Sequence, residues 1–181
     1  MANYRNATLL DLDRIIKLNE LSLPENYPSD HWKSLLMDPG SKGLSFVALD
    51  PNNKKYVLGY IIGYLIQPDE HEKEAEIRLY SLAVSEKARK RGIGNKLVEL
   101  FVNAAKTKNL PISLHVRASN TPAIELYRKH HFKVRKLEEK YYSNPEEDAL
   151  YMRYTDPSKS DIEQPIEHVT HEDHCSCGHA H

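Results

Sequence analysis

The chain has 181 residues, of which 40% are hydrophobic and 28% are charged, and its formal net charge at pH 7 is -1. These values are typical of a soluble globular protein of one domain, and they exclude a fibrous or a largely disordered chain. No apolar run approaches the roughly 20 residues of a membrane helix, and the N-terminal residues lack the layout of a secretory signal, so we expect a cytoplasmic protein without membrane association.

The N-terminal segment predicts a short strand followed by two helices. Residues 3–7 are expected to be extended, and Thr8 is typical of an N-cap that opens a helix with one apolar face. This helix should end before Pro24, because proline restricts the backbone of the preceding residue, and residues 23–28 then form a loop between two prolines. Ser29 is expected to cap the short second helix.

Three strands are expected next. Residues 44–49 and 56–66 are strand candidates, separated by a turn over residues 50–53. The second of these is apolar nearly throughout, as a central strand covered on both faces is. An acidic stretch, residues 69–76, is most simply a solvated loop, and residues 76–84 predict another central strand.

A basic segment with two glycines, residues 87–94, joins this strand to an amphipathic helical pattern. The N-terminus of a helix leaves backbone N–H groups unpaired and carries a partial positive charge, so it is suited to hold phosphate. Gly92 and Gly94 let the backbone turn sharply and approach a bulky ligand closely. Five cationic residues between positions 87 and 96 add long-range attraction. The alternative is an ordinary solvated basic turn before a helix.

The spacing of these glycines excludes two common phosphate-binding motifs. The Walker motif has four residues between its glycines and then Lys-Ser/Thr, whereas Gly92 and Gly94 are one residue apart. The dinucleotide-binding motif has a third glycine where Leu97 stands. The pattern that remains is Arg89-x-x-Gly92-x-Gly94 after a strand.

The rest of the chain predicts a strand, a helix and two closing strands. Residues 112–116 alternate in character as a strand does, and Asn120-Thr121-Pro122 offers a cap for a helix. Strands over residues 132–142 and 149–154 are joined by an acidic loop. The predicted order is therefore strand, two helices, three strands, helix, strand, helix and two strands, with no internal repeat.

Five motifs in this order resemble one protein family. The Arg89-x-x-Gly92-x-Gly94 pattern resembles the acyl-CoA pyrophosphate loop, Q/R-x-x-G-x-G/A, of the GCN5-related N-acetyltransferase (GNAT) superfamily. The second conserved block of that family is similar to Leu114-His115-Val116 followed by Ser119-Asn120-x-x-Ala123-x-x-Leu126-Tyr127-x-Lys129-x-x-Phe132. Two further strings resemble the protein N-terminal acetyltransferases, specifically the catalytic subunit of NatA and its archaeal counterparts: Leu23-Pro24-Glu25-Asn26-Tyr27, and Lys140-Tyr141-Tyr142 followed by Glu147-Asp148-Ala149. The similarity spans residues 3–154.

The resemblance implies an α/β (α+β) fold with a mixed, mostly antiparallel sheet of about seven strands, helices on both faces and two central strands that splay apart. Acetyl-CoA would enter the gap from one side and the substrate peptide from the other. The resemblance places the pantetheine and acetyl carbonyl against the backbone of Leu82, Ala83 and Val84, and the sulfur end near Asn120 and Tyr127. The pyrophosphate would lie against Arg89, Lys90, Arg91, Gly92, Ile93, Gly94 and Asn95.

The implied activity is acetyl transfer from acetyl-CoA to the free α-amino group of protein N-termini. An α-amine has a reference pKa of about 7.7 to 8.0, so it needs little help to lose its proton. A carboxylate or His reaching it through one water would suffice, and Glu25 is the first choice and His115 the second. Tyr127 matches the general-acid position of the family, and a backbone N–H near Val84 could stabilise the oxyanion. For His115 and Tyr127 the alternative is an ordinary place in the core.

Aromatic side chains are expected to form the substrate slot. Besides Glu25, the residues expected to contact the peptide are Leu23, Tyr27, Tyr141 and Tyr142. The alternative role of the tyrosines is to pack a hairpin on the first loop. The chain departs from the NatA-like pattern at Arg78, beside Tyr80, where that subgroup often has His. The loop around Glu25 favours small or acidic first residues over an intact Met.

Other functions remain open on the same fold. They are acetylation of a Lys or a small-molecule amine, and a non-catalytic acyl-CoA-binding module. The family resemblance allows an auxiliary subunit or ribosome association, whereas specific nucleic-acid binding is not expected. The basic loop is flanked by Glu86 and Glu99 and would make a poor phosphate track.

The C-terminal segment differs from the rest in charge and composition. Residues 1–154, the predicted acetyltransferase domain, carry 24 Lys+Arg and 20 Asp+Glu. Residues 155–181 carry one Lys and six Asp+Glu. The segment is predicted to be a mostly disordered acidic tail because it lacks apolar periodicity. It is either a metal-handling tail or an incidental polar extension, and no metal is assigned to catalysis. Its metal-ligating types are His168, His171, His174, Cys175, Cys177, His179 and His181.

Overall fold

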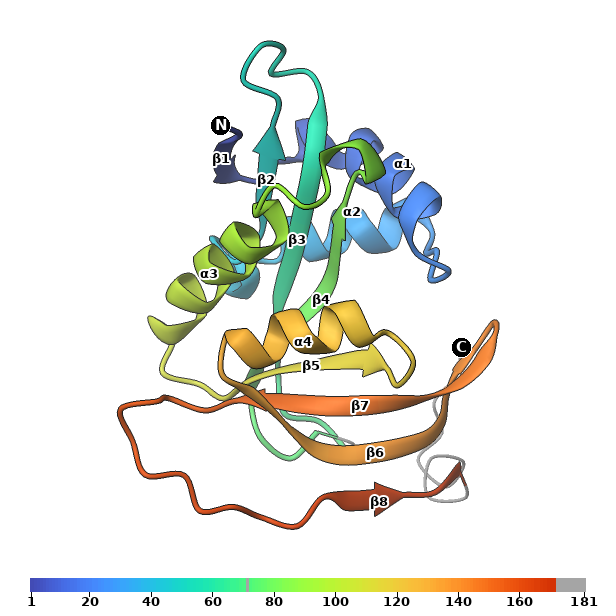
Figure 1. Ribbon diagram of the computed structural model, residues 1–181, viewed down its shortest axis with the longest axis vertical. Coiled ribbons are helices and arrows are strands. Elements are labelled where there is room, and N and C mark those ends of the chain that lie inside the picture. Colours follow the sequence, from blue (N-terminus) through green and yellow to red (C-terminus); the bar gives the residue numbers. More distant parts are fainter. Residues whose placement is uncertain (71, 172–181) are drawn as a thin grey trace.

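The computed structural model describes residues 1–70 and 72–171, which form one sheet with helices on both faces (Figure 1). The strand order in the sheet is β1-β2-β3-β4-β5-β7-β6-β8. The strands are β1 (Asn3–Asn6), β2 (Phe46–Leu49), β3 (Val57–Ile66), β4 (Glu76–Val84), β5 (Ile112–Arg117), β6 (Phe132–Ser143), β7 (Glu146–Tyr154) and β8 (Glu167–Val169). The helices are α1 (Leu12–Ser22), α2 (Ser29–Met37), α3 (Ile93–Lys106) and α4 (Thr121–Lys129), with short 3-10 turns at η1 (Leu9–Asp11), η2 (Pro39–Ser41) and η3 (Glu86–Ala88).

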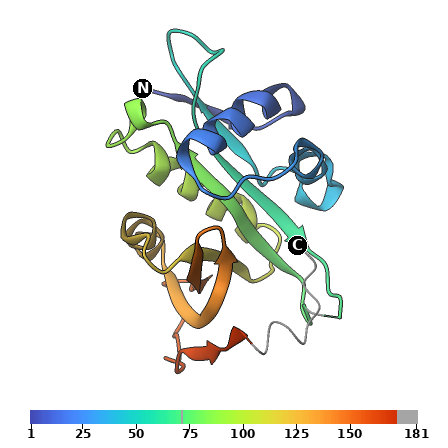
Figure 2. The ribbon, with the colours of Figure 1, turned by 90° about the vertical axis from the view of Figure 1, so that its right-hand side faces the viewer.

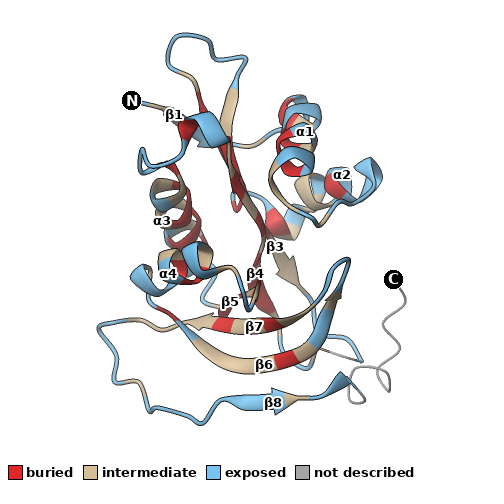
Figure 3. Ribbon diagram, turned by 45° about the vertical axis from the view of Figure 1, so that its right-hand side comes forward, coloured by how far each residue is buried: buried red, intermediate tan, exposed pale blue. Residues whose placement is uncertain are grey.

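The sheet separates two hydrophobic cores. Helices α1 and α2 pack on one face, and α3 and α4 pack on the other (Figure 3). Successive residues of β3 supply both cores. Tyr60 and Ile62 lie in the core under α1 and α2, and Ile61 lies in the core under α3 and α4. This alternation explains why β3 is apolar nearly throughout, and it confirms the prediction of a strand covered on both faces.

The two central strands part after three residue pairs. Strands β4 and β5 are parallel and pair only from Ile77 with Ile112 to Leu79 with Leu114. The next residue of β4, Tyr80, is skipped in the pairing with β3, which marks a β-bulge that re-aims the strand at this point. The prediction of splayed central strands is therefore confirmed, and Figure 1 shows the two halves of the sheet running in different directions.

The described residues contain one strand more than the seven expected from the sequence. The additional strand, β8, comes from the segment predicted to be mostly disordered, and it pairs with β6 in parallel (Figure 2). Ion pairs fix the segment as well, because Asp161 contacts both Lys133 and Arg135 of β6. These contacts bridge distant parts of the chain, so local composition gives no sign of them.

The predicted acidic loop between the last two strands is a tight turn in the structure, since β7 begins at Glu146 rather than at residue 149. Two of its acids are held by backbone donors. Glu147 accepts a hydrogen bond from the backbone N–H of Ser119, and Asp148 accepts one from the N–H of Lys140. The two strands are thereby extended to the tip of the hairpin.

The first helix is held by a buried carboxylate. Asp11 accepts hydrogen bonds from the backbone N–H and the hydroxyl of Thr8, as in a capping box, and it forms a bidentate pair with Arg5 of β1. Burial raises the pKa of the Asp11 carboxyl, but the hydrogen bonds from Arg5 and Thr8 outweigh burial and leave this pKa below its ordinary value. The second helix differs from the prediction, because Pro28 rather than Ser29 occupies the N-cap.

Asp11→Asn is expected to lower the free energy of unfolding by about 1–2 kcal/mol at neutral pH, because Arg5 loses its charged partner. A carboxyl whose pKa is lowered by folding stabilises the fold above the ordinary Asp range and ceases to do so as the pH falls through the lowered pKa. The difference in the free energy of unfolding between the wild-type protein and Asp11→Asn should therefore decrease in acid. Urea unfolding at neutral and acid pH measures it, with the exposed Asp13→Asn as control. An equal difference in the free energy of unfolding at neutral and acid pH would contradict this explanation.

Candidate active site

A cavity of about 200 Å³ lies where β4 and β5 have parted. It is lined by the loop after α1, by the second half of β4, by β5, by α4 and by the hairpin of β6 and β7. Most residues that the sequence predicted for catalysis, the sulfur end or the substrate lie around it, namely Leu23, Glu25, Tyr27, Leu82, His115, Asn120, Tyr127, Tyr141 and Tyr142. The structure thus brings together side chains from five separate segments.

The carboxylate of Glu25 is held by an arginine that the sequence analysis missed. The Nε and Nη2 atoms of Arg117, on β5, both lie 2.6 Å from Oε1 of Glu25. Arg117 also contacts Glu147 at 3.1 Å, and its guanidinium lies 4.3 Å from the ring centre of Tyr142. A guanidinium shared between two carboxylates fixes the orientation of Glu25, which lines the cavity.

His115 lies two residues before Arg117, and it has a carboxylate partner of its own. Its Nε2 lies 2.5 Å from Oε2 of Glu138, on β6, and both side chains are about nine-tenths buried. The ring stacks on Tyr141 with 4.4 Å between the ring centres and 8° between the planes. His115 therefore has the burial and the partners of a satisfied core histidine, and it also lines the cavity.

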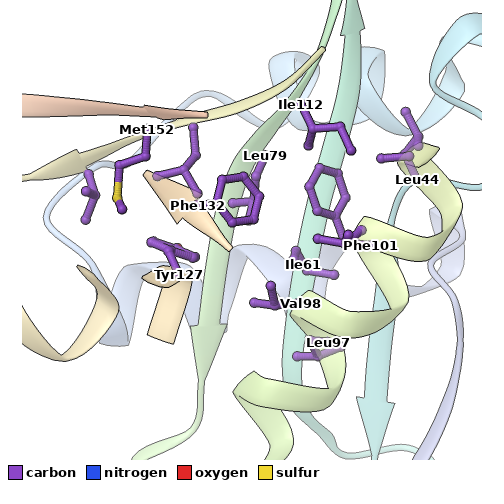
Figure 4. Close-up of a cluster of buried hydrophobic side chains, with 14 of the residues drawn as sticks. Leu44, Ile61, Leu79, Leu97, Val98, Phe101, Ile112, Tyr127, Phe132 and Met152 are labelled. Carbon is purple, nitrogen blue, oxygen red and sulfur yellow. The ribbon is translucent and has the colours of Figure 1, made fainter. Parts of the chain in front are cut away.

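Tyr127 is positioned by α4. The side chain of Asn120 caps this helix by accepting a hydrogen bond from the N–H of Ala123 at 3.3 Å. The ring of Tyr127 packs edge-on against Phe132 in the core (Figure 4), while the residue also lines the cavity. Burial raises the pKa of the Tyr127 hydroxyl, which therefore keeps its proton and can donate it. Tyr127 is thus a core residue that also lines the cavity.

Two aromatic side chains, Tyr27 and Tyr80, form a wall of the cavity, and His31 contacts both of them. The Tyr80 side chain, re-aimed by the bulge, lies 5.3 Å from Tyr27 between ring centres, and its hydroxyl lies 2.8 Å from Nε2 of His31. This wall was only partly foreseen, because Tyr80 and His31 stand in segments with no motif of their own. The wall limits the room for a side chain in the cavity.

Arg78 takes the place where the resembled subgroup often has His. Its guanidinium contacts Glu76 and Glu72, and its Nε donates to the hydroxyl of Ser113 at 3.3 Å. Burial disfavours the charge, but these carboxylates prevail and raise the pKa of Arg78. A permanently charged guanidinium cannot serve as a base, so Arg78 cannot take the proton-accepting role that a histidine could have at this position.

The basic loop forms the helix N-terminus expected from the sequence. Gly92 is the N-cap of α3 and is left-handed, with φ of 75°. The first helical donor is the N–H of Lys96, bonded to the carbonyl of Gly92, so the amides between them remain available for an anion. A Cβ at Gly94 would lie 3.5 Å from Leu126 and 3.7 Å from Val84, which places this turn between the end of β4 and α4.

Two of the predicted cofactor residues have other contacts in the structure. The side chain of Arg89 turns back and its Nε donates to the carbonyl of Val84 at 3.3 Å. Ala83 is buried in the core beneath α1 and α2, so it can face the gap only through its backbone. The backbone of Leu82, Ala83 and Val84 lies beyond the last pair that β4 makes with β5.

A larger cavity of about 1090 Å³ lies elsewhere, between the start of β5 and the segment before β8. It contains none of the residues predicted for catalysis, and its lining mixes acidic and basic side chains of the surface. Size therefore does not identify the site here. The smaller cavity is the candidate because proton acceptors, a proton donor and a parted pair of strands meet in it.

Comparisons with known proteins agree with this geometry. The family model described as the acetyltransferase (GNAT) family matches residues 12–132. The N-alpha-acetyltransferase of Saccharolobus solfataricus is 36% identical over 156 residues, which cover 82% of this chain and 90% of that protein. The N-terminal acetyltransferase A complex catalytic subunit NAA10 of Arabidopsis thaliana is 33% identical, and the match covers 84% of this chain and 77% of that protein. Chaetomium thermophilum Naa20, solved in complex with a bisubstrate analogue, aligns with a TM-score of 0.77 at 26% identity. The alignment covers 94% of this chain and 98% of that chain.

Proposed function

The chain belongs to the acetyltransferase (GNAT) family, and on that premise we propose that it is an N-terminal acetyltransferase, which transfers the acetyl group of acetyl-CoA to the free α-amino group of proteins. The observation that carries this function is the cavity between the parted ends of β4 and β5. Around it lie Glu25 held by Arg117, His115 held by Glu138, and a buried tyrosine. The proposed catalytic domain is residues 1–154.

The residues of the chain fit acetyl-CoA. The turn at Gly92 offers free amides to the pyrophosphate, and Lys90, Arg91 and Lys96, all within four positions of Gly92, add positive charge. Beyond Leu79, the edge of β4 has no strand partner on the side of β5, so its backbone can bond the pantetheine arm. When bound, acetyl-CoA would supply an activated acetyl thioester, and everything else in the transfer is assigned to residues of this chain.

The proton balance of the reaction sets what the proposed residues have to do. An α-ammonium nitrogen that becomes an amide nitrogen gives up two protons. Glu25 is the proposed acceptor of the first, through a water, and His115 is the second candidate. Tyr127 donates its own proton to the leaving sulfur and regains one of the two protons that the nitrogen gives up, and the other passes to solvent. The amides at the end of β4, near Val84, are proposed to stabilise the negative charge that develops on the carbonyl oxygen.

Similarity to named subunits also informs the partners. Relatives include catalytic subunits of N-terminal acetyltransferase complexes, and solved neighbours include the NatC complex bound to a peptide and CoA. We propose peptide N-termini as the substrate and an auxiliary subunit as a partner of this chain. Across residues 1–70 and 72–171, no helix is both long and apolar enough to cross a membrane. A cytoplasmic location remains part of the proposal.

The size of the cavity predicts a preference for small first residues. The acceptors and the aromatic wall share about 200 Å³, so a long first side chain must displace Tyr27 or Tyr80. Peptides beginning with Ala or Ser are expected to show kcat/KM values at least about tenfold above a peptide beginning Met-Leu. Steady-state kinetics over this set measures the ratio, and a peptide beginning with Glu tests whether an acidic residue is accepted. A preference for Met-Leu would show that the wall opens.

The function itself is tested by the choice of amine. A peptide with a free α-amine and no lysine is compared with one whose terminus is blocked and which carries a free lysine, with acetyl-CoA in both reactions. We expect acetylation of the first peptide only. Acetylation of the blocked peptide alone would instead assign a lysine acetyltransferase, and binding of acetyl-CoA without any turnover would assign a binding module.

A further inference from the structure

The pair formed by His115 and Glu138 has no role in the scheme above beyond that of a second acceptor. The contact is short, at 2.5 Å between Nε2 and Oε2, and 23 positions separate the two residues in the sequence. Both side chains are largely buried, with exposed fractions of 11% and 12%. A buried carboxylate this close to a ring nitrogen fixes which nitrogen carries the proton, because an ionised carboxylate can only accept.

The bonding of the ring follows from this contact. With its proton on Nε2, a neutral imidazole presents a lone pair on Nδ1. Among the described residues no hydrogen-bond partner of Nδ1 is found, and the ring is clamped by stacking on Tyr141. His115 also lines the cavity beside Glu25 and Tyr127. Nδ1 is therefore the ring atom left as a proton acceptor, on a side chain that lines the cavity.

The backbone that carries Glu138 is held on both sides. In β6, Glu138 is paired with Ala149 of β7 and with Val169 of β8. The strand β8 belongs to the segment beyond residue 154, and it covers only Lys136, Leu137 and Glu138. The carboxylate is thus presented from the one stretch of β6 that has a partner on each edge, which limits its freedom to move away from His115.

We propose that Glu138 is a positioning residue of the active site, which accepts the Nε2 proton of His115 and thereby leaves Nδ1 free to take a proton from the substrate amine. The proposal rests on the proposed function and deepens it. When Nδ1 takes up that proton the ring becomes an imidazolium, and the carboxylate of Glu138 offsets the new charge within a largely buried pair.

The first measurement needs neither a variant nor turnover. The ¹⁵N spectrum of the wild-type imidazoles, with the His115 signals identified by their loss in His115→Gln, reports which ring nitrogen is protonated. We expect His115 to be the tautomer protonated on Nε2. A ring protonated on Nδ1 would overturn the proposal, whether or not the protein proves to be an acetyltransferase.

The second measurement is kinetic. Glu138→Gln keeps the size of the side chain and removes the charge, so kcat is expected to fall at least about tenfold while KM for acetyl-CoA changes little. The matched control is Glu139→Gln in the same strand, expected to leave kcat unchanged. In a His115→Gln background, Glu138→Gln should not lower kcat further, because Glu138 acts through the ring of His115. Equal losses in both backgrounds, or no loss in the wild-type background, would contradict the proposal.

Discussion

Glu25→Gln is expected to lower kcat by about 10²- to 10⁴-fold, because the amide cannot accept the proton that the amine must lose. The substitution keeps the size and shape of the side chain, so binding of acetyl-CoA should be unaffected. Stopped assays of peptide acetylation under saturating acetyl-CoA measure the loss. The result expected for a side chain that merely closes the loop is instead a near-normal kcat.

The control for this experiment is supplied by the second carboxylate on Arg117. Glu147→Gln disturbs the same arginine, which lies 3.1 Å from Glu147, but it leaves the proposed acceptor in place. We expect it to lower kcat less than about tenfold, in keeping with one weakened ion pair. If both variants lost activity equally, the ion-pair network rather than proton acceptance by Glu25 would limit the reaction.

Gly92→Val is expected to weaken acetyl-CoA binding at least about tenfold. Nothing lies within 4 Å of a Cβ placed at this residue, so the cause is the backbone and not crowding within the protein. A β-branched residue is a poor occupant of the left-handed region, at a cost of about 1–3 kcal/mol. The turn relieves that strain by leaving the conformation that aligns its amides. Isothermal titration with acetyl-CoA gives the dissociation constant.

The chain offers a matched control in Gly43. This residue is also left-handed, with φ of 82°, and it too has open space around a Cβ, but it lies in the turn before β2. Gly43→Val should therefore lose a similar amount of stability and bind acetyl-CoA normally. Unchanged binding by Gly92→Val, together with a stability loss like that of Gly43→Val, would mean that the pyrophosphate lies elsewhere.

Local patterns were sufficient for much of the fold. The apolar run of β3, the glycine turn before α3 and the Asn120 cap of α4 each depend on neighbours within a few residues, and each lies where the sequence predicts it. The resemblance to the family added the splay of β4 and β5, which no local pattern encodes. The strand β8 was missed because its pairing depends on β6, about thirty positions earlier.

The sequence analysis named many of the residues that line the cavity, but it did not name their side-chain partners. Glu25, His115 and Tyr127 meet around one cavity, yet the partners that define their chemistry were not foreseen. Glu25 and Arg117 are 92 positions apart, and such a pair leaves no periodic trace in a single sequence. The same holds for His115 and Glu138. A charged residue directly following an apolar strand motif, as Arg117 follows Val116, is the one signal that could have drawn attention.

The central claim is that the acetyl thioester lies between the parted ends of β4 and β5. Addition of acetyl-CoA to the ¹⁵N-labelled protein, followed by its amide resonances, tests this most directly. The account predicts that the largest shifts fall on residues 82–84 at the end of β4 and on residues 92–95 at the start of α3. Shifts confined to residues 109–112 and 155–161, which border the larger cavity, would contradict it, as would a spectrum that does not change.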